Sequence, residues 1–544
     1  LTRSSWSYNC NVTLNLGGSY RDSESESFSR SEINYYQRKT NDFNNQYTTS
    51  PSTSYNFRTR LSYSEPIIGA LNLQMSYQFQ YRYSDNDRSM YSIDSLLTKF
   101  GGYYTQEQLY LGYIPGLDSL NYCYNAENSQ YATYREYNHE ANIMFRYKQG
   151  ENRLNVGVSL QPQTTHMDYA KNLLDTTVVR NTFNWSPRID YRWKISDTSE
   201  LRVRFNGDMN QPSMTDLLEV TDSSDPLHIS TGNSGLRSSW RNNFNLFYNA
   251  YVPTKQRGWM VNAYYNQTRN SISSATIYNT ETGARYTRPM NINGNWYSGG
   301  SLMFNTAMGE KKYFNIHTFT NINYGNNVGY LSSNSDGSNW DNIYLPNGNV
   351  NMDYIFTHTP LQKATTKTTN INENLRLNFR NDLLEVGVSG GVNYQHARSA
   401  LQKSANMDNW SYNYGGNITI NAPWGTSLST DINEQCRRGY EDASMNTNEL
   451  IWNAQVSQTF LKNRAATISV QWYDILRERS SISRSISATM RSDSWSNAIH
   501  SYVMVHLIYK LNLMGAKGSR TQGFGGYGGP GGGRGGRGGG PGHF

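Results

Sequence analysis

The stretch GALNLQMSYQFQYRYSD, residues 69–85, alternates apolar and polar side chains without a break. Leu71, Leu73, Met75 and the aromatic residues at 77, 79, 81 and 83 form one set, and the positions between them hold only Asn, Gln, Ser and Arg. A period of two places the two sets on opposite faces of a β-strand. The alternation lasts about 13 residues, whereas a typical soluble strand has about 5–6 and a tilted membrane-spanning strand has roughly 9–11. The stretch therefore predicts a strand that crosses a membrane.

The same alternation recurs along the chain, for example at residues 154–160, 201–206, 375–380 and 503–513. Arginine occupies the polar face in two of these strands, as Arg202 and Arg204 and as Arg376 and Arg380. A barrel with a wet interior places such residues inside and the apolar face toward lipid. The four arginines are therefore candidate ligand-binding residues that would favour an anionic solute. The alternative is that they pair with acidic residues of the wall or of a plug domain.

The composition fits a membrane barrel better than a large soluble core. Only 36% of the 544 residues are hydrophobic, and the mean hydropathy is −0.74, yet 13% are aromatic and 43 are tyrosine. A soluble chain of this length buries a larger apolar share, and the aromatic content argues against disorder. Tyrosine suits both strands and membrane–water boundaries. The sequence contains no run of 18 apolar residues, so it predicts no membrane-spanning helix. The net charge of +7 is spread along the chain.

The connections between strands support a fold class. We predict nineteen strands, near residues 5–17, 27–39, 53–64, 69–83, 133–148, 152–165, 178–194, 198–208, 240–252, 257–278, 286–307, 312–325, 370–380, 383–397, 410–421, 426–438, 448–461, 466–473 and 500–513. From residue 53 onward each short link, such as KQGEN, is followed by a longer one, such as 84–132, 166–177 or 326–369. Bacterial outer-membrane barrels alternate short periplasmic turns with long extracellular loops. The sequence therefore predicts an all-β protein with a large antiparallel transmembrane β-barrel.

The beginning of the barrel is predicted from strand direction. The last strand, 500–513, is preceded by a long loop and must run down to the periplasm, and counting directions back from it makes strand 5–17 run down as well. The acidic stretch RDSESES at 21–27 that follows is interpreted as a solvated turn, with an ion-binding loop as the alternative. Bacterial outer-membrane barrels have even strand numbers, which predicts at least one further strand before Leu1. Residues 1–514 are then an N-terminally incomplete barrel. The glycine-rich residues 515–544 are predicted to be a disordered, periplasmic tail.

Enzymatic and cofactor motifs are absent from the sequence. It has no G-x-S-x-G, H-E-x-x-H, P-loop or paired Cys-x-x-Cys, and its three cysteines lack metal spacing. We therefore predict no enzyme activity, no cofactor and no metal site. Arg534 and Arg537 in the tail are similar to those of nucleic-acid-binding glycine–arginine segments. A flexible tail after a membrane strand is the favoured interpretation, with no nucleic-acid partner.

One segment resembles a known family. Residues 209–249 contain Gln211-Pro212-Ser213 and, later, Gly232-Asn233-Ser234-Gly235-Leu236. They are similar to a stretch of the TonB-dependent outer-membrane receptors that ends in G-N-P-x-L-x-P-E, with Ser234 replacing the first proline. The outer membrane protein beta-barrel branch of these receptors matches best. The resemblance implies a 22-stranded barrel, of which about 19 strands lie in this chain. It also implies an N-terminal plug domain, absent from these residues, and energy from a TonB-type inner-membrane complex.

Three functions remain open at this stage. The first is the barrel of an energy-coupled importer of a bulky nutrient in the outer membrane of a Gram-negative bacterium, with long loops outside and both termini periplasmic. The second is a structural or adhesive barrel whose loops 84–132 and 326–369 bind other macromolecules. The third is a passive porin. The lipid bilayer is the one partner that all three share.

Overall fold

The computed structural model describes residues 11–35, 39–94, 120–279, 282–334, 343–346, 350–401, 403, 406–440, 443–461, 464–479, 482–486, 491–496 and 499–510. Strands dominate it, and 24 of them belong to one sheet. Within the described residues no helix is long and apolar enough to cross a membrane.

The strands of the large sheet are β1 (Asn11–Ser23), β2 (Glu26–Tyr35), β3 (Thr40–Thr49), β4 (Ser52–Ile68), β5 (Leu71–Ser92), β6 (Gln130–Gln149), β7 (Asn152–Lys171), β8 (Leu174–Ser196), β9 (Ser199–Asn210), β10 (Asp222–Asp225), β11 (His228–Ser230), β12 (Ser239–Val252), β13 (Arg257–Arg269), β14 (Ser271–Asn279), β15 (Arg285–Ile292), β16 (Asn295–Met308), β17 (Phe314–Asn334), β18 (Gln362–Arg380), β19 (Leu384–Ser399), β20 (Met407–Asn421), β21 (Thr426–Arg438), β22 (Asn448–Phe460), β23 (Ala466–Tyr473) and β26 (Tyr502–Tyr509). A separate hairpin joins β24 (Ile482–Ile486) and β25 (Arg491–Trp495). The helical elements are α4 (Met214–Leu217), α5 (Met352–His358), η1 (Pro253–Lys255) and η4 (Ala443–Met445).

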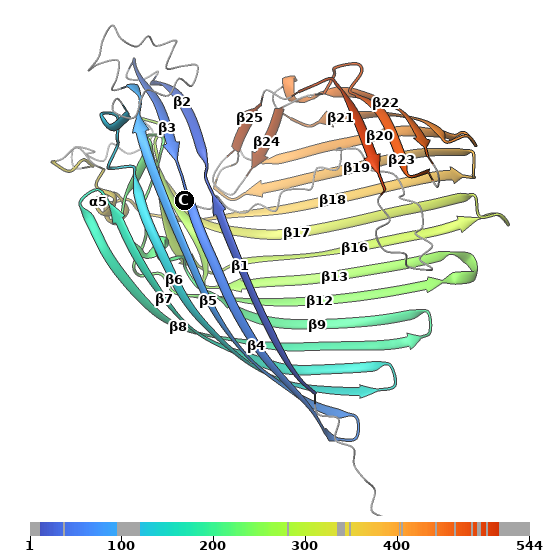
Figure 1. Cartoon of the computed structure of the whole chain (residues 1–544). Coiled ribbons are helices and arrows are strands. Elements are labelled where there is room, and N and C mark those ends of the chain that lie inside the picture. The colour runs from blue at the N-terminus through green and yellow to red at the C-terminus, as the bar shows by residue number, and fades with distance from the viewer. Residues whose placement is uncertain are drawn as a thin grey trace, which may run out of the picture.

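The wall of the molecule is one strongly curved antiparallel sheet (Figure 1). Its strands pair in the order β1, β4 to β9, β12, β13, β16 to β23 and β26. Of the 24 strands, β2, β3, β10, β11, β14 and β15 lie outside this wall, and the other 18 form it. β1 and β26 are its two ends, and no pairing joins them within the described residues. This confirms the predicted all-β antiparallel architecture.

Tight turns join neighbouring strands at one end of the wall. Two residues separate β6 from β7, and Gly150 there has a φ of +60°, which glycine adopts at little cost. Two residues also separate β8 from β9, and three separate β18 from β19. Longer connections, including α4, α5 and the β14–β15 hairpin, gather at the opposite end. The alternation of short turns and longer loops is thus largely as predicted.

The first hairpin differs from the prediction. The acidic stretch 21–27 is not a turn, because β1 continues to Ser23 and β2 begins at Glu26. β1 and β2 run up together and β3 and β4 run back down, with Asn11 opposite Ser64 near the tight β4–β5 turn. β1 therefore starts on the tight-turn side, and segment 27–39 adds no strand to the wall. The predicted direction of 5–17 was wrong, and the parity argument for missing strands fails with it.

A second difference lies between β7 and β8. Residues 166–177 were predicted to be a loop, but the strands extend through them and meet at a two-residue turn. Asn172 takes the left-handed φ of +52° at this turn, and Leu173 is 96% exposed at its tip. Asparagine tolerates this conformation better than most residues. β7 and β8 consequently reach well beyond the part of the wall that the alternation had marked.

The outer face of the wall carries the predicted apolar residues. Val203 is 38% exposed and Leu377 is 44% exposed, and Leu73 is half-buried, so none lies in a dry protein interior. The same face exposes Phe145, Trp193, Leu246, Ile322, Val388, Ile418, Val456 and Val470. We call this apolar zone of the outer face the belt. An exposed apolar zone of this extent fits contact with lipid and not with water.

Beyond the belt the strands continue into a region that we call the crown. It contains the loop ends of the strands, residues 211–238 (the infolded segment), the β14–β15 hairpin and α5. Three buried clusters lie here, one of them uniting Ile277 and Tyr286 of the hairpin with Ile355 of α5. Within the described residues the clustered apolar core therefore lies in the crown and not in the belt.

Candidate functional site

A cavity of about 1510 Å³ opens on the inner face of the wall within the crown. One side is formed by strands β4 to β8, through residues such as Ser84, Glu136 and Gln163. The other side is formed by the infolded segment and by the β14–β15 hairpin, including Ser230 and Thr287. The strand residues belong to the polar set of each alternation, so this set faces the lumen. The cavity is larger than the roughly 300–1,000 Å³ common for small-ligand pockets.

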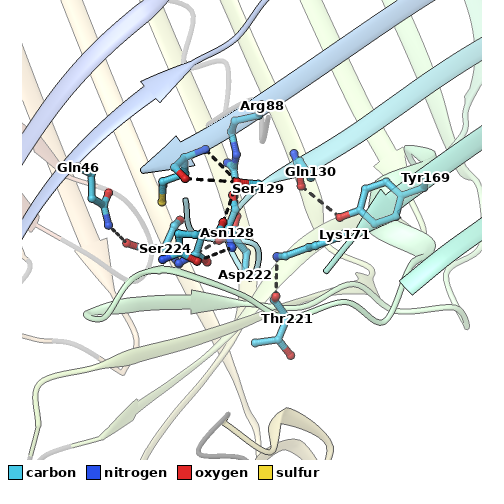
Figure 2. A network of polar contacts seen from close by, with 12 residues as sticks. Gln46, Arg88, Asn128, Ser129, Gln130, Tyr169, Lys171, Thr221, Asp222 and Ser224 are labelled. Atoms are coloured by element: carbon cyan, nitrogen blue, oxygen red, sulfur yellow. Dashed lines mark hydrogen bonds and ion pairs between the residues drawn. The ribbon is translucent and has the colours of Figure 1, made fainter. Parts of the chain in front are cut away.

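A polar network ties the infolded segment to the wall (Figure 2). Arg88 of β5 forms an ion pair with Asp222 of β10 at 3.4 Å and donates to the Asn128 carbonyl at 2.9 Å. Lys171, the last residue of β7, donates to the Thr221 carbonyl at 2.8 Å. Farther along, Gln46 of β3 donates to the Ser224 carbonyl at 3.1 Å. Strands β3, β5 and β7 thus hold three positions of the segment, 221, 222 and 224.

The charges in this network support one another. Burial alone would raise the pKa of Asp222, but attraction by Lys171 and Arg88 and hydrogen bonds from Ser224 outweigh it, so the pKa is lowered. The Lys171 ammonium, beyond the belt, has a lowered pKa because its burial outweighs the attraction of Asp222. A lowered pKa favours the charged form of Asp222 but disfavours the charged form of Lys171. The carboxylate is favoured because it faces two cations, Lys171 and Arg88. Asp222 is therefore ionised at neutral pH and anchors the segment electrostatically.

The motifs at 211–213 and 232–236 close the base of the infolded segment. Arg180 of β8 donates to the Pro212 carbonyl and to the Gln211 side-chain oxygen, both at 3.0 Å. A Cβ at Gly232 would lie 2.0 Å from the Leu218 carbonyl oxygen, so only glycine fits there. The Asn233 side chain donates to the Pro289 carbonyl at 2.9 Å, which ties the segment to β15. The residues that carried the family resemblance therefore position one side of the cavity.

Two of the four predicted arginines are engaged by the wall itself. Arg202 and Arg204 both face the lumen and both reach the Asp190 carboxylate, at 2.8 Å and 3.0 Å. Asp190 lies opposite Arg204 in the register of β8 and β9. Within the described residues this matches the alternative that such arginines pair with wall carboxylates. Neither side chain lines the cavity.

The other two arginines lie nearer the tight turns. Arg380 approaches Glu385 of the next strand at 3.5 Å, across an exposed turn. Arg376 is exposed on the lumen face, opposite His317 and Ser389. It has no ion pair within the described residues. The four predicted residues are therefore not brought together, and their ligand-binding role stays a prediction.

Other predicted features fall partly outside the described residues. The tail from 515, with Arg534 and Arg537, is outside them entirely, as are 95–119 of loop 84–132 and both 335–342 and 347–349 of loop 326–369. In the part of the chain that the structure describes, no three His, Cys, Asp or Glu side chains are grouped as metal ligands. Absence of enzyme activity and of a cofactor stays a prediction.

Sequence reasoning missed the residues that build the cavity. Arg88, Lys171 and Asp222 lie in segments that had been assigned to loops, where no periodicity singles out a residue. One signal was available, since Ser213 precedes a short helix and its hydroxyl accepts from the Asp216 N–H at 3.0 Å. Such a capping pattern predicts a folded turn. It does not predict that the turn folds inward.

A curved antiparallel wall with an apolar outer belt, tight turns at one end and a polar inner face defines a membrane β-barrel protein of the outer-membrane type. The profile of the Outer membrane protein beta-barrel family matches residues 9–361, which is more than half of the chain. The chain therefore belongs to the Outer membrane protein beta-barrel family, and the family resemblance is confirmed at this level. The family places it in the outer membrane.

Solved structures with similar strand arrangements are transporters and receptors. The copper transporter OprC has 8% identity, with 87% of this chain and 75% of that chain covered, at a TM-score of 0.42. The siderophore receptor PiuA from Acinetobacter baumannii has 9% identity, with 93% and 78% covered, at 0.38. The RagAB peptide importer has 8% identity, with 79% and 58% covered, at 0.38. Similarity at this level assigns no activity to this chain, and no curated protein matches the sequence.

Proposed function

We propose that this chain is the barrel part of an outer-membrane receptor that imports a bulky solute, and that the crown cavity is where the solute binds. The observation that carries the proposal is the cavity of about 1510 Å³, enclosed between strands β4 to β8 and the infolded segment. Its volume exceeds that of ordinary small-molecule pockets. A segment held by one ion pair and single hydrogen bonds, such as 221–224, can also be released without unfolding the wall.

Orientation and energy supply are part of the same proposal. The crown would face the outside of the cell and the tight turns the periplasm, as is general for barrels of this kind. A wide lumen needs a plug, so a plug domain and a TonB-type complex are the expected partners, in line with the family resemblance. The solute would bind in the crown cavity before such partners release it inward.

Uptake by cells tests the proposal. Cells with the complete gene and a deletion strain would be given a peptide digest, an oligosaccharide mixture and a set of ferric chelates, and depletion of the medium followed by mass spectrometry. We expect one class to be depleted only by cells that carry the gene and only while the proton gradient is intact. Equal depletion by both strains contradicts import. Depletion that survives an uncoupler contradicts energy coupling.

Two matched variants assign the uptake to the cavity. Gln163 lines the cavity, whereas Gln161 on the same strand and face does not. Each makes one weak hydrogen bond to a neighbour two residues away, to Thr165 and Ser159 respectively. Gln163→Trp should therefore reduce uptake by filling the cavity, and Gln161→Trp should leave it unchanged. Equal effects would show that the solute does not bind in this cavity.

A further inference from the structure

Basic side chains cluster on the outer face of the wall where β18 to β21 leave the belt. In the strand register Lys367 is opposite Arg398, His396 is opposite Asp408, and Trp410 is opposite Arg438. Opposed residues of an antiparallel pair project from the same face. That face is the outer one, because it alternates in step with the exposed apolar residues Leu377, Val388 and Ile418. We call Lys367, His396, Arg398 and Arg438 the basic patch.

The belt fixes the depth of this patch in the membrane. On β18 the outward side chains run from Leu377 and Leu375 past Glu373, which accepts from the Thr318 and Thr320 hydroxyls, to Ile371, and Lys367 follows four residues later. On β20 they run from Ile418 to Tyr414 and Trp410, all exposed, and Asp408 comes next. Aromatic rings at the edge of an apolar zone mark the membrane–water boundary. The basic patch therefore lies at the level of lipid headgroups.

One carboxylate, Asp408, neutralises only part of the positive charge of the basic patch. Asp408 accepts hydrogen bonds from Tyr394 at 2.9 Å and from Arg398 at 2.6 Å, with His396 Nδ1 at 2.5 Å. Because Arg398, His396 and Tyr394 donate to it, the pKa of Asp408 lies far below its usual range. Asp408 therefore stays ionised, and its charge is used by Arg398.

Among the described residues, two further cations have no carboxylate partner. Arg438 donates to neutral acceptors, namely the carbonyls of Arg437 and Thr447 and the Asn448 side-chain oxygen. Lys367 is exposed and has no ion pair or hydrogen bond within the described residues. Glu434 also faces outward, but it lies four residues deeper than Arg438, where Tyr414 donates to it. The patch thus presents net positive charge toward the membrane surface.

The opposite sector of the wall differs at the same height. There the outward side chains beyond the belt include Asp85, Asp168 and Asp175, and the arginine among the described outward residues, Arg135, is paired with Asp168 at 2.9 Å. Outward positive charge is thus neutralised in this sector and not fully at β18–β21, whereas on β13 the exposed Arg269 also projects outward, opposite Trp240.

We propose that the basic patch binds the phosphate groups of lipids in the leaflet on the crown side. Arginine presents several donors in a planar fork that matches phosphate oxygens, and lysine adds a point charge. Trp410 and Tyr394 lie beside them and can contact the upper acyl chains and sugar or glycerol of the same lipid. The inference rests on the proposed orientation, in which the crown-side leaflet is the outer one that holds lipid A, and it does not depend on the cavity or on any imported solute.

Native mass spectrometry of the full chain in detergent tests the proposal. The probes are lipid A with both phosphates, lipid A without phosphates, and inorganic phosphate. We expect retention of the diphosphorylated lipid alone. In Lys367→Gln with Arg438→Gln the apparent affinity should fall by roughly 25-fold, since each basic residue near an anionic surface contributes about fivefold, or about 1 kcal/mol. Retained resistance of the barrel to heating in detergent shows that the variant is folded.

Arg135→Gln is the matched control, because it removes an outward cation at the same height that is already neutralised by Asp168. It should leave lipid retention unchanged. Equal retention of lipid A with and without phosphates would overturn the proposal, as would unchanged retention in the double variant or an equal loss in the control. Displacement of the lipid by inorganic phosphate at similar concentrations would show a simple anion site and would also overturn it.

Discussion

The belt and the crown use the same strands with opposite polarity, and β7 shows the change within a single strand. In the belt its outward residues are Leu154, Val156, Val158 and Leu160, and its lumen residues are polar. In the crown its outward residues are Thr164, His166 and Asp168. Its lumen residues there include Met167, which is fully buried against Met214 of the infolded segment, and Tyr169.

The inversion follows from what each face touches. In the belt the outer face meets lipid and the inner face meets water, so apolar side chains point out. Beyond the belt the outer face meets water, and the inner face is covered by the infolded segment, so apolar side chains point in. The alternation of a strand therefore reports its surroundings and not its distance from the centre of the protein. Stability has separate origins in the two regions, and each can be perturbed alone.

The largest effect should come from the core of the crown. Ile277 is fully buried in the cluster with Tyr286 and Ile355, and Ile277→Ala should cost roughly 2–5 kcal/mol of local stability. Limited proteolysis should show faster cleavage within 211–238 and the β14–β15 hairpin, while the heat resistance of the wall in detergent is retained. Simultaneous melting of wall and crown would show that the two regions are one cooperative unit.

The belt should respond to charge. Val203→Arg places a cation on the lipid face and should destabilise the folded barrel by roughly 2–4 kcal/mol, or less if the site is near an interface. Asn206→Ala on the lumen face of the same strand is the control, and it should be nearly silent, because Asn206 makes only a long 3.4 Å side-chain bond to Asp208. Urea titration of folding into lipid vesicles measures both. Similar losses at the two positions would contradict the assignment of faces.

The belt could be predicted from the sequence, and the crown could not, for one physical reason. Within the belt each strand has lipid outside and water inside along its length. The apolar residues Leu201, Val203 and Phe205 of β9 therefore all fall on the outward face. On β7 the phase changes after Pro162, because apolar Met167 and Tyr169 fall on the other face. Across this change the apolar residues of β7 do not stay on one face, so the alternation of apolar and polar residues is lost. Residues 166–177 were therefore predicted to be a loop. The acidic residues at 21–27 likewise suggested a turn, but Arg21 to Ser23 pair with β4 and Glu26 and Ser27 pair with β3.

The anchoring of the infolded segment should show an intermediate effect. Asp222→Asn removes the ion pair with Arg88 and leaves two cations without their carboxylate, which should cost about 1–3 kcal/mol. Faster proteolysis near residues 221–224 is the expected readout, with Asp175→Asn on the outer face as a silent control. If Asp222→Asn and Asp175→Asn are cleaved at the same rate as the unaltered chain, the network does not hold the segment.

Acid should reproduce this loss in the unaltered protein. The pKa of Asp222 is lowered in the folded state, so its contribution is fully present above the unfolded pKa of about 3.9 and is lost as the pH falls through the lower folded value. Proteolytic release of the segment should therefore begin only below about pH 4. With Asp222→Asn this acid step should disappear.

The smallest effect should come from the predicted lumen arginines. Arg376 is exposed and has no ion pair within the described residues, so Arg376→Gln should change stability by less than about 0.5 kcal/mol. Arg202→Gln should cost more, because it leaves Asp190, which is almost fully buried, with fewer donors. Urea titration distinguishes them. The sequence identified both as lumen residues. Whether each has a partner depends on strand register, of β8 against β9 for Arg202 and of β18 against β17 and β19 for Arg376, and composition does not reveal that register.

The most direct test of the membrane assignment is the accessibility of successive positions on β9 and β7 in lipid. Spin labels at single cysteines would be measured for contact with oxygen, which concentrates in lipid, and with a water-soluble nickel chelate. We expect labels at 201, 203 and 205 to contact oxygen and those at 202, 204 and 206 the chelate. On β7 the outward label at 158 should contact oxygen, and the outward label at 166 should contact the chelate. Chelate contact at 203, or no change between 158 and 166, would contradict the account of a lipid-facing belt below a water-exposed crown.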